Sequence, residues 1–283
     1  MNTREIRKRI ASIKKTQQIT KAMKMVAAVR YRKALQNLTA NRPYRQEMEY
    51  IIGDLIAKKN DNYEHPYFIA RKKAEKELLI LITSDKGFCG SFNSTLLKNC
   101  LKQLRLNGSG TDVIALGKKG RDFLGARCFS AMAEYNGVMN ALNYVSADKI
   151  VKEILLKFFS GNYKEVTIMY NEFKVVTQAK TKIFKLLPLA TGGKKTLSSE
   201  FIFEPDLKSL LEELLPKYIS VIFYGILLES NAAEQGLRMT SMEQATKNTE
   251  ELMKKLTLQY NKVRQGNITK ELNDLVGGAA AVS

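Results

Sequence analysis

The stretch MTSMEQATKNTEELMKKLTLQYNKV, residues 239–263, determines the fold expected for this chain. Eight of its residues follow one another at intervals of three or four without a slip: Met239, Met242, Thr246, Thr249, Met253, Leu256, Tyr260 and Val263. This spacing is the heptad pattern of a helix that packs along a narrow seam against another helix.

The register continues toward the N-terminus through Gln235, Ala232 and Leu228. Pro216 suits an early helical position, where its missing N–H does no harm. We therefore expect a helix from about Lys217 to Leu275, within a C-terminal shaft segment of residues 207–283.

The first 59 residues repeat the theme. Good helix formers dominate them, and Pro43 is expected to kink the helix because proline removes a hydrogen bond and clashes with the preceding turn. Their seam is narrow and partly polar, with other apolar residues displaced to one side, as expected of a helix with more than one partner face. The seam consists of Ile6, Ile10, Ile13, Gln17, Thr20, Lys24, Ala27, Ala34 and Leu38, and the displaced residues are Ile19, Met23 and Val26.

Each terminal segment would be about 80 to 90 Å long at ~1.5 Å per residue. Such helices need a partner, because an isolated amphipathic helix gains little stability in water. Two seams at opposite ends of one chain favour an intramolecular antiparallel coiled coil. The alternative is two ordinary surface helices folded onto one domain.

Between the helices, strand and helix patterns alternate over residues 76–205. Strands are expected at Leu78–Thr83, Asp112–Leu116, Val166–Tyr170 and Val175–Leu187, and helices at Phe92–Leu104, after Gly117 and at Ala147–Phe159. This alternation predicts an α/β, Rossmann-like domain with a parallel sheet.

Composition limits the partners and the compartment. The chain has 46 Lys and Arg against 28 Asp and Glu, a formal charge of +18, which implies an acidic partner. Three cysteines without C-x-x-C spacing favour a reducing cytoplasm and indicate no disulfide framework or zinc site. No signal or transit peptide is apparent, and the longest apolar run, Val221–Leu228, is too short to cross a membrane.

The most tempting chemical motif is Ser84-Asp85-Lys86-Gly87-Phe88-Cys89-Gly90, which follows the first strand. Glycine-rich turns at this place often bind phosphate. However, the motif lacks the G-x-G-x-x-G spacing of a dinucleotide site, and the Gly192–Thr196 stretch lacks the pattern of a P-loop. We interpret these glycines as turn formers, and we expect no cofactor.

Catalytic residues are equally scarce. The only histidine, His65, lies in a polar connection and is expected at the surface. Adjacent carboxylates such as Glu212 and Glu213 fit solvated faces, and no His, Cys and carboxylate cluster has metal-ligand spacing. From its residues alone, the chain is a basic coiled-coil interaction protein with a noncatalytic α/β domain.

Three blocks of sequence resemble the gamma subunit of F-type, bacterial ATP synthases. They are Ile6–Ala28, the Ser84–Asn93 turn, and a C-terminal block running from Glu229-Ser230 through Glu234-Gln235, Arg238-Met239 and Tyr260–Gln265 to Leu272. The family turn more often has Arg and Leu at the positions of Lys86 and Phe88. The middle domain has no inserted cysteine pair of the kind found in chloroplast members.

The resemblance implies a noncatalytic rotor shaft inside a hexamer of three alpha and three beta subunits, in contact with epsilon and a c-subunit ring. Ion flow would turn ring and shaft, and catalysis would stay on beta. The protein would lie at the cytoplasmic face of the bacterial inner membrane, attached only through the complex.

The resemblance also assigns residues. Positions where the family's rotor helices contact beta are occupied here by Met23, Arg238, Arg264, Gln265 and Thr269, and the family turn motif by Ser84, Asp85, Gly87, Cys89 and Gly90. Residues 1–35 hold 11 basic side chains against the single acid Glu5. Against the acidic loops of the family's stator, exchangeable ion pairs would suit a sliding contact.

Two other classes of protein stay open. A basic coiled coil could bind nucleic acid, although its basic residues surround the helix and few aromatics are available for stacking. A Rossmann-type nucleotide enzyme would need the phosphate-binding loop that is missing.

Overall fold

A computed structural model describes residues 2–57, 65–69, 74–175, 178–189 and 206–280. The chain forms two compact units, Met1–Ala28 with Met239–Ser283, and Val29–Arg238. Both terminal helices run from one unit into the other. These units follow spatial contacts, so the domain segments expected along the sequence stay a prediction.

Helix α1, Thr3–Ala57, is continuous and contains Pro43. Every seam position expected between Ile6 and Leu38 is buried or half-buried. The same spacing continues through Met48, Ile52 and Leu55, which are all buried. The polar residues of the seam are therefore shielded from solvent together with the apolar ones.

Helix α5, Leu207–Ala280, begins earlier than the expected Lys217. Asp206 stabilises its start, because its carboxylate accepts hydrogen bonds from the backbone N–H groups of Lys208 and Ser209 at 3.0 and 3.2 Å. Pro216 consequently lies inside the helix and not in its first turn. All eight seam residues from Met239 to Val263 are buried or half-buried, as predicted.

A five-stranded mixed sheet lies in the unit Val29–Arg238, with strand order β3-β2-β1-β4-β5. Its strands are β1 Lys76–Ile82, β2 Thr111–Leu116, β3 Ala131–Tyr135, β4 Tyr163–Val175 and β5 Gln178–Leu187. The expectation of a wholly parallel sheet is wrong, because β5 pairs antiparallel with β4. Only two residues separate these strands, too few for the crossover that a parallel pair needs.

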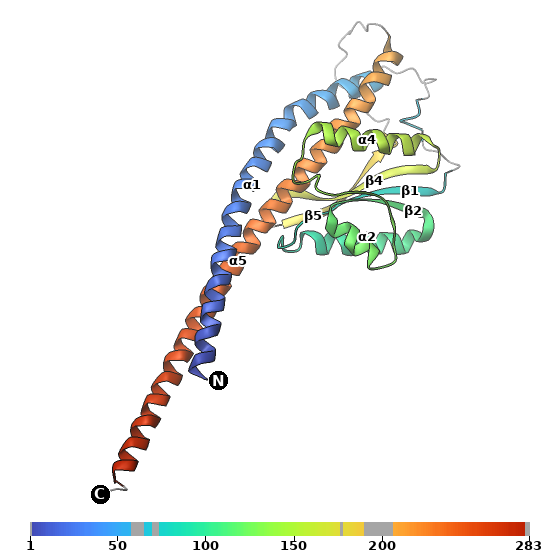
Figure 1. The fold of residues 1–283 in the computed structure, drawn as a ribbon. Helices are drawn as coiled ribbons and strands as arrows, with labels where there is room; N and C mark the ends of the chain where they lie inside the picture. The colour runs from blue at the N-terminus through green and yellow to red at the C-terminus, as the bar shows by residue number, and fades with distance from the viewer. Residues whose placement is uncertain (1, 58–64, 70–73, 176–177, 190–205, 281–283) are drawn as a thin grey trace. The chain divides into compact units, whose positions relative to one another are not determined.

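Helices cover both faces of this sheet, with α4 on one side and α2 on the other (Figure 1). Leu78, Ile80 and Ile82 of β1 pack toward α4, Tyr144–Phe159, and α5, whereas Leu79 and Leu81 pack toward α2, Phe92–Asn107. A third helix, α3, Lys118–Gly125, lies between β2 and β3 in the chain. Burial on both faces explains the uninterrupted apolar run in β1.

Two features of this unit differ from the sequence interpretation. Strand β3 was not anticipated, since its alternating, partly exposed residues give a weak signal. His65 is buried, with 6% of its surface exposed, and not at the surface. Its ring stacks on that of Tyr67 with centroids 5.0 Å apart, so an aromatic neighbour two residues away provides the cover that the polar sequence did not suggest.

Candidate functional site

The helical pair of residues 2–28 and 239–280 is antiparallel and joined by polar contacts along its seam. Gln17 Nε2 donates to Glu250 Oε1 at 3.1 Å, and Thr246 Oγ1 donates to Thr20 Oγ1 at 2.9 Å. Lys24 Nζ lies 3.1 Å from Glu243 Oε1. These polar contacts join the two helices at positions between the apolar residues of the seam, such as Ile6, Ala27 and Met242, which are buried.

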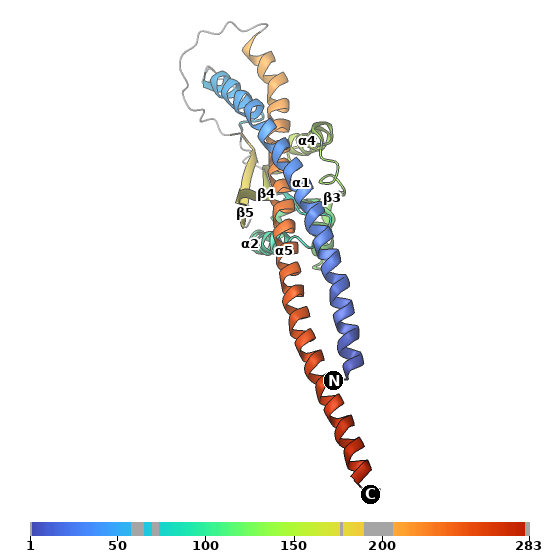
Figure 2. The same cartoon turned by 90° about the vertical axis from the view of Figure 1, so that its left-hand side faces the viewer.

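The last part of α5 extends past the start of α1 (Figure 2). Residues 264–273 are all exposed, and they include the predicted contact residues Arg264, Gln265 and Thr269. The Thr269 hydroxyl donates to the carbonyl of Gln265 at 2.9 Å within the helix. Three of the five predicted contact residues therefore lie on an open helical surface.

Apolar side chains are also exposed on both helices of this unit. On α1 they are Ile19, Met25 and Val26, and on α5 they are Leu252, Leu258, Ile268, Leu272, Leu275 and Val276. Met23, the fourth predicted contact residue, is half-buried beside them in sequence. Exposed apolar residues among basic ones are typical of a surface that meets another protein.

In the other unit, the predicted turn motif connects β1 to α2. Ser84 Oγ donates to the Lys86 carbonyl at 2.7 Å, and Asn93 Nδ2 donates to Ser84 Oγ at 2.7 Å and to Cys89 Sγ at 3.3 Å. Phe88 and Gly90 have φ of 61° and 58°, and Phe88 projects as an exposed side chain. The polar groups of the turn thus stabilise its own shape.

Asp85 links this turn to two neighbouring loops. Its carboxylate accepts hydrogen bonds from the Lys118 N–H at 3.1 Å, the Gly137 N–H at 3.3 Å and Asn140 Nδ2 at 2.9 Å. One carboxylate therefore joins the turn after β1 to the first residue of α3 and to the loop after β3.

Arg238, the fifth predicted contact residue, clamps the same turn from α5. Its Nε donates to the Gly87 carbonyl at 3.3 Å, and its Nη2 donates to the Lys86 carbonyl at 3.2 Å. The same Nη2 lies 2.7 Å from Glu234 Oε1. Arg238 and Glu234 are 8% and 4% exposed, so the pair is shielded from water.

Burial has the largest effect on the pKa values of Glu234 and Cys89, which lie at this clamp. It raises the pKa of Glu234 above the usual glutamate range, while Arg238 opposes the rise. Burial likewise raises the pKa of the Cys89 thiol, which keeps the thiol protonated near neutral pH. Arg238 and Glu234 both belong to the C-terminal sequence block, but their ion pair was not predicted, although their i, i+4 spacing on a helix was a signal for it.

The described residues offer little for catalysis. Among them, no three His, Cys, Asp or Glu side chains are grouped to hold a metal ion. Across the same ranges, no helix is both long and apolar enough for a bilayer crossing. The features that stand out among the described residues are the exposed apolar and basic side chains of the helical pair and the turn held by Arg238, with the exposed Phe88.

Comparisons with known proteins agree with this description. A family model described as ATP synthase matches residues 2–282. The chain is 38% identical to the ATP synthase gamma chain of Pelotomaculum thermopropionicum over 281 residues, covering 99% of this chain and 98% of the relative. It is 39% identical to the gamma chain of Chlorobium limicola over 286 residues, with coverage of 99% and 98%.

Solved structures from Tetrahymena thermophila and Euglena gracilis contain chains with a similar fold. The central stalk and c-ring structure of the Tetrahymena thermophila mitochondrial ATP synthase contains a chain that matches with 31% identity and a TM-score of 0.61, covering 80% of this chain and 99% of that one. A chain in the Euglena gracilis mitochondrial ATP synthase matches with a TM-score of 0.73 at 21% identity, covering 99% and 94%.

Proposed function

Because the chain belongs to the ATP synthase gamma chain family, we propose that it is the central rotor shaft of an F-type ATP synthase. It couples ion-driven rotation of a c ring to ATP synthesis at catalytic sites that belong to beta subunits, and it is itself noncatalytic. The observation that carries this proposal is the match over 99% of the chain to gamma chains at 38% identity.

The partners follow from the same assignment. The shaft passes through a ring of three alpha and three beta subunits, and it binds epsilon and the c ring. The similarity to a Tetrahymena chain described with a central stalk and c ring supports the last of these contacts. The complex lies at the cytoplasmic face of the bacterial inner membrane, and this subunit associates with the membrane only through it.

Within the complex, we assign the contact with beta to Met23, Arg264, Gln265 and Thr269. The exposure of the last three and the apolar residues around them support this role. The 11 basic side chains in residues 1–35 attract acidic loops of the surrounding subunits, and exposed pairs that contribute only about 0 to 1 kcal/mol each can exchange as the shaft turns.

Arg238 takes part in coupling in a different way. Because its guanidinium is buried against the turn, it acts by holding residues 84–90, and with them the exposed Phe88, in a fixed position. Contact of Arg238 itself with beta stays a prediction.

Copurification tests the function. A tagged copy of the chain, expressed in its own organism, is purified under mild conditions, and its partners are identified by mass spectrometry. Recovery of alpha, beta and epsilon is expected. Recovery of nucleic acid in their place would instead favour the basic nucleic-acid-binding protein, an alternative to which the family assignment gives no support.

A further inference from the structure

Residues 83–85, which follow β1, cap the start of α3. The first N–H groups of a helix have no carbonyl partner within it and need acceptors from elsewhere. Gly117, which precedes α3, has no side chain that could cap the helix, and residues 83–85 accept these hydrogen bonds in its place. The donors and acceptors are Lys118 N–H with Asp85 Oδ1 at 3.1 Å, Lys119 N–H with the Ser84 carbonyl at 3.1 Å, and Gly120 N–H with Thr83 Oγ1 at 2.8 Å.

Two glycines make this close approach possible. A Cβ atom on Gly117 would lie 2.3 Å from the Thr83 carbonyl oxygen, and one on Gly120 would lie 2.9 Å from Thr83 Oγ1. Gly117 also has a φ of 97°, which residues with a side chain rarely adopt. The two glycines therefore let α3 begin directly against the end of β1.

Asp85 differs from its two neighbours because it contributes a charge. Besides the N–H of Lys118, its carboxylate accepts hydrogen bonds from the Gly137 N–H at 3.3 Å and from Asn140 Nδ2 at 2.9 Å. The N-terminus of a helix carries a partial positive charge, which favours an anion at this place. The three donors thus form an anion-binding position, and the chain fills it with its own carboxylate.

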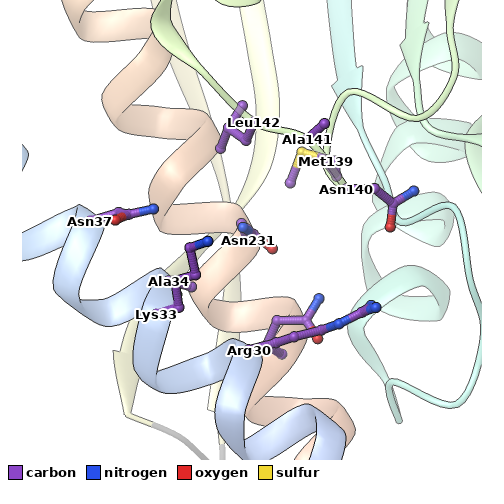
Figure 3. A pocket seen from close by; sticks show the side chains of 10 residues that line it. Arg30, Lys33, Ala34, Asn37, Met139, Asn140, Ala141, Leu142 and Asn231 are labelled. Atoms are coloured by element: carbon purple, nitrogen blue, oxygen red, sulfur yellow. The ribbon is translucent and has the colours of Figure 1, made fainter.

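The loop that contributes Gly137 and Asn140 is not fully packed. Asn140, Met139 and Ala141 of this loop line a cavity of about 310 Å³ (Figure 3). The cavity lies within the unit Val29–Arg238, and residues of α1 and α5 line the rest of it. Packing is therefore incomplete on one side of the loop, so its hydrogen bonds to Asp85 contribute to its position.

We infer that Asp85 is a positioning residue for coupling, which holds the turn 84–90 on the side of the sheet while Arg238 holds it on the side of α5. For its effect on coupling, this inference rests on the proposed function. Phe88, the exposed side chain of the turn, directly follows the two carbonyls that Arg238 contacts and lies three residues after Asp85. Anchors on both sides keep Phe88 in one position, and loss of the Asp85 carboxylate should release it.

Amide hydrogen exchange of the full chain, followed by mass spectrometry, tests the anchor. The Ser84 N–H, bonded to Asn93 Oδ1 at 3.1 Å, reports on the turn, and the Lys118 N–H reports on the start of α3. In Asp85→Ala both should exchange about tenfold faster or more, because hydrogen bonds to a charged group are lost. At constant ionic strength, formate should slow the exchange again, since it has the shape and charge of the missing carboxylate. Formamide, which is neutral and of the same size, should slow it less.

Asp122→Ala is the matched control. Asp122 lies on α3 itself, but its carboxylate is exposed and pairs with the neighbouring Arg121 at 2.8 Å. This variant should exchange like the wild type, with or without formate.

A second variant at Asp85 separates charge from size. Asp85→Asn keeps the size but not the charge, and its amide occupies the place that formate would take. It should exchange faster than the wild type and give no response to formate, and it decides the question if Asp85→Ala does not fold. Wild-type exchange in Asp85→Asn, or equal effects of formate and formamide on Asp85→Ala, would overturn the anchor.

The consequence for coupling is measured in the assembled complex. In membrane vesicles, the number of ions pumped per ATP hydrolysed should fall several-fold in Asp85→Asn and stay unchanged in Asp122→Ala. An unchanged ratio in Asp85→Asn, together with faster exchange of its turn, would overturn the role in coupling. Failure of the wild-type chain to recover alpha and beta subunits would instead overturn the proposed function, and the exchange result would still decide whether Asp85 anchors the turn.

Discussion

The Gly87 carbonyl accepts a hydrogen bond from Nε of Arg238 at 3.3 Å, although 151 residues separate the two. This contact joins the turn after β1 to α5, and Glu234 completes it from one helical turn away. The clamp therefore makes the position of an exposed loop depend on the long C-terminal helix.

Removing the arginine should loosen this turn. Arg238→Gln leaves Glu234 buried without its cation, which typically costs about 3 to 5 kcal/mol in proteins. Cys89 should then react faster with N-ethylmaleimide, because its burial depends on the same turn. Alkylation rates followed by mass spectrometry check this, with the exposed Cys128 as internal reference.

A matched pair on the same helix provides the control for Arg238→Gln. Lys217 and Glu213 have the same i, i+4 spacing and a 2.7 Å ion pair, but both are exposed. Lys217→Gln should leave Cys89 alkylation and thermal stability unchanged. Equal Cys89 rates in Arg238→Gln and the wild type would show that the clamp does not hold the turn.

Acid should weaken the helical pair through Glu243. Its hydrogen bond and ion pair with Lys24 lower its pKa below the ordinary 4.5, so the folded carboxylate binds its proton less readily than the unfolded one. The stabilisation is present above pH 4.5 and is lost as the pH falls through the lowered folded value. For an exposed pair the effect is small, less than about tenfold in local opening.

Amide hydrogen exchange of residues 239–250 measures this local opening. Comparison with Glu243→Gln at each pH cancels the intrinsic pH dependence of exchange. The wild type should be better protected at pH 7, and this advantage should shrink as the pH falls below 4.5. Glu251→Gln, which removes an exposed carboxylate without an ion pair among the described residues, should match the wild type throughout. A wild-type advantage that does not decrease on acidification would refute the assignment.

The heptad positions show what could be predicted from the sequence. Residues at intervals of three and four, such as Met242 and Thr246, had to share a face once the segment was helical, and they do. The apolar run of β1 similarly required cover on both sides. Such features depend only on local spacing, which the sequence contains in full.

The features that were missed depend on contacts distant in the chain or on weak local signals. Nothing local to Arg238 indicates that its guanidinium meets the Gly87 carbonyl. For His65 the polar residues before it outweighed a local signal, the aromatic residues Tyr67 and Phe68 that follow it and contact its ring. Strand β3 is short and half-exposed, so its own sequence pattern is a weak signal. Its conformation depends mainly on its pairing with β2. The exposed positions of Arg264 and Gln265 fit their predicted contact with beta, and this contact is tested in the assembled complex.

Charge reversal at Arg264 should lower ATP-driven ion pumping more than it lowers the amount of assembled complex. Arg264→Glu places a negative charge where the family resemblance implies contact with beta, and like charges at an interface cost several kcal/mol. ATP-driven ion pumping in membrane vesicles should fall several-fold, while the amount of assembled complex changes little. Lys262→Glu, two residues away and so on the other side of the helix, is the control. Unchanged pumping in Arg264→Glu would remove this residue from the contact.

The central claim is that this chain turns inside a stator, and single-molecule rotation tests it most directly. Of its three cysteines only Cys128 is exposed, so a biotin-linked bead can be attached there in a complex whose alpha and beta subunits are fixed to glass. On addition of ATP, the bead should rotate persistently in one direction at a speed that rises with ATP concentration. A stationary bead on a complex that hydrolyses ATP at its normal rate would contradict the account.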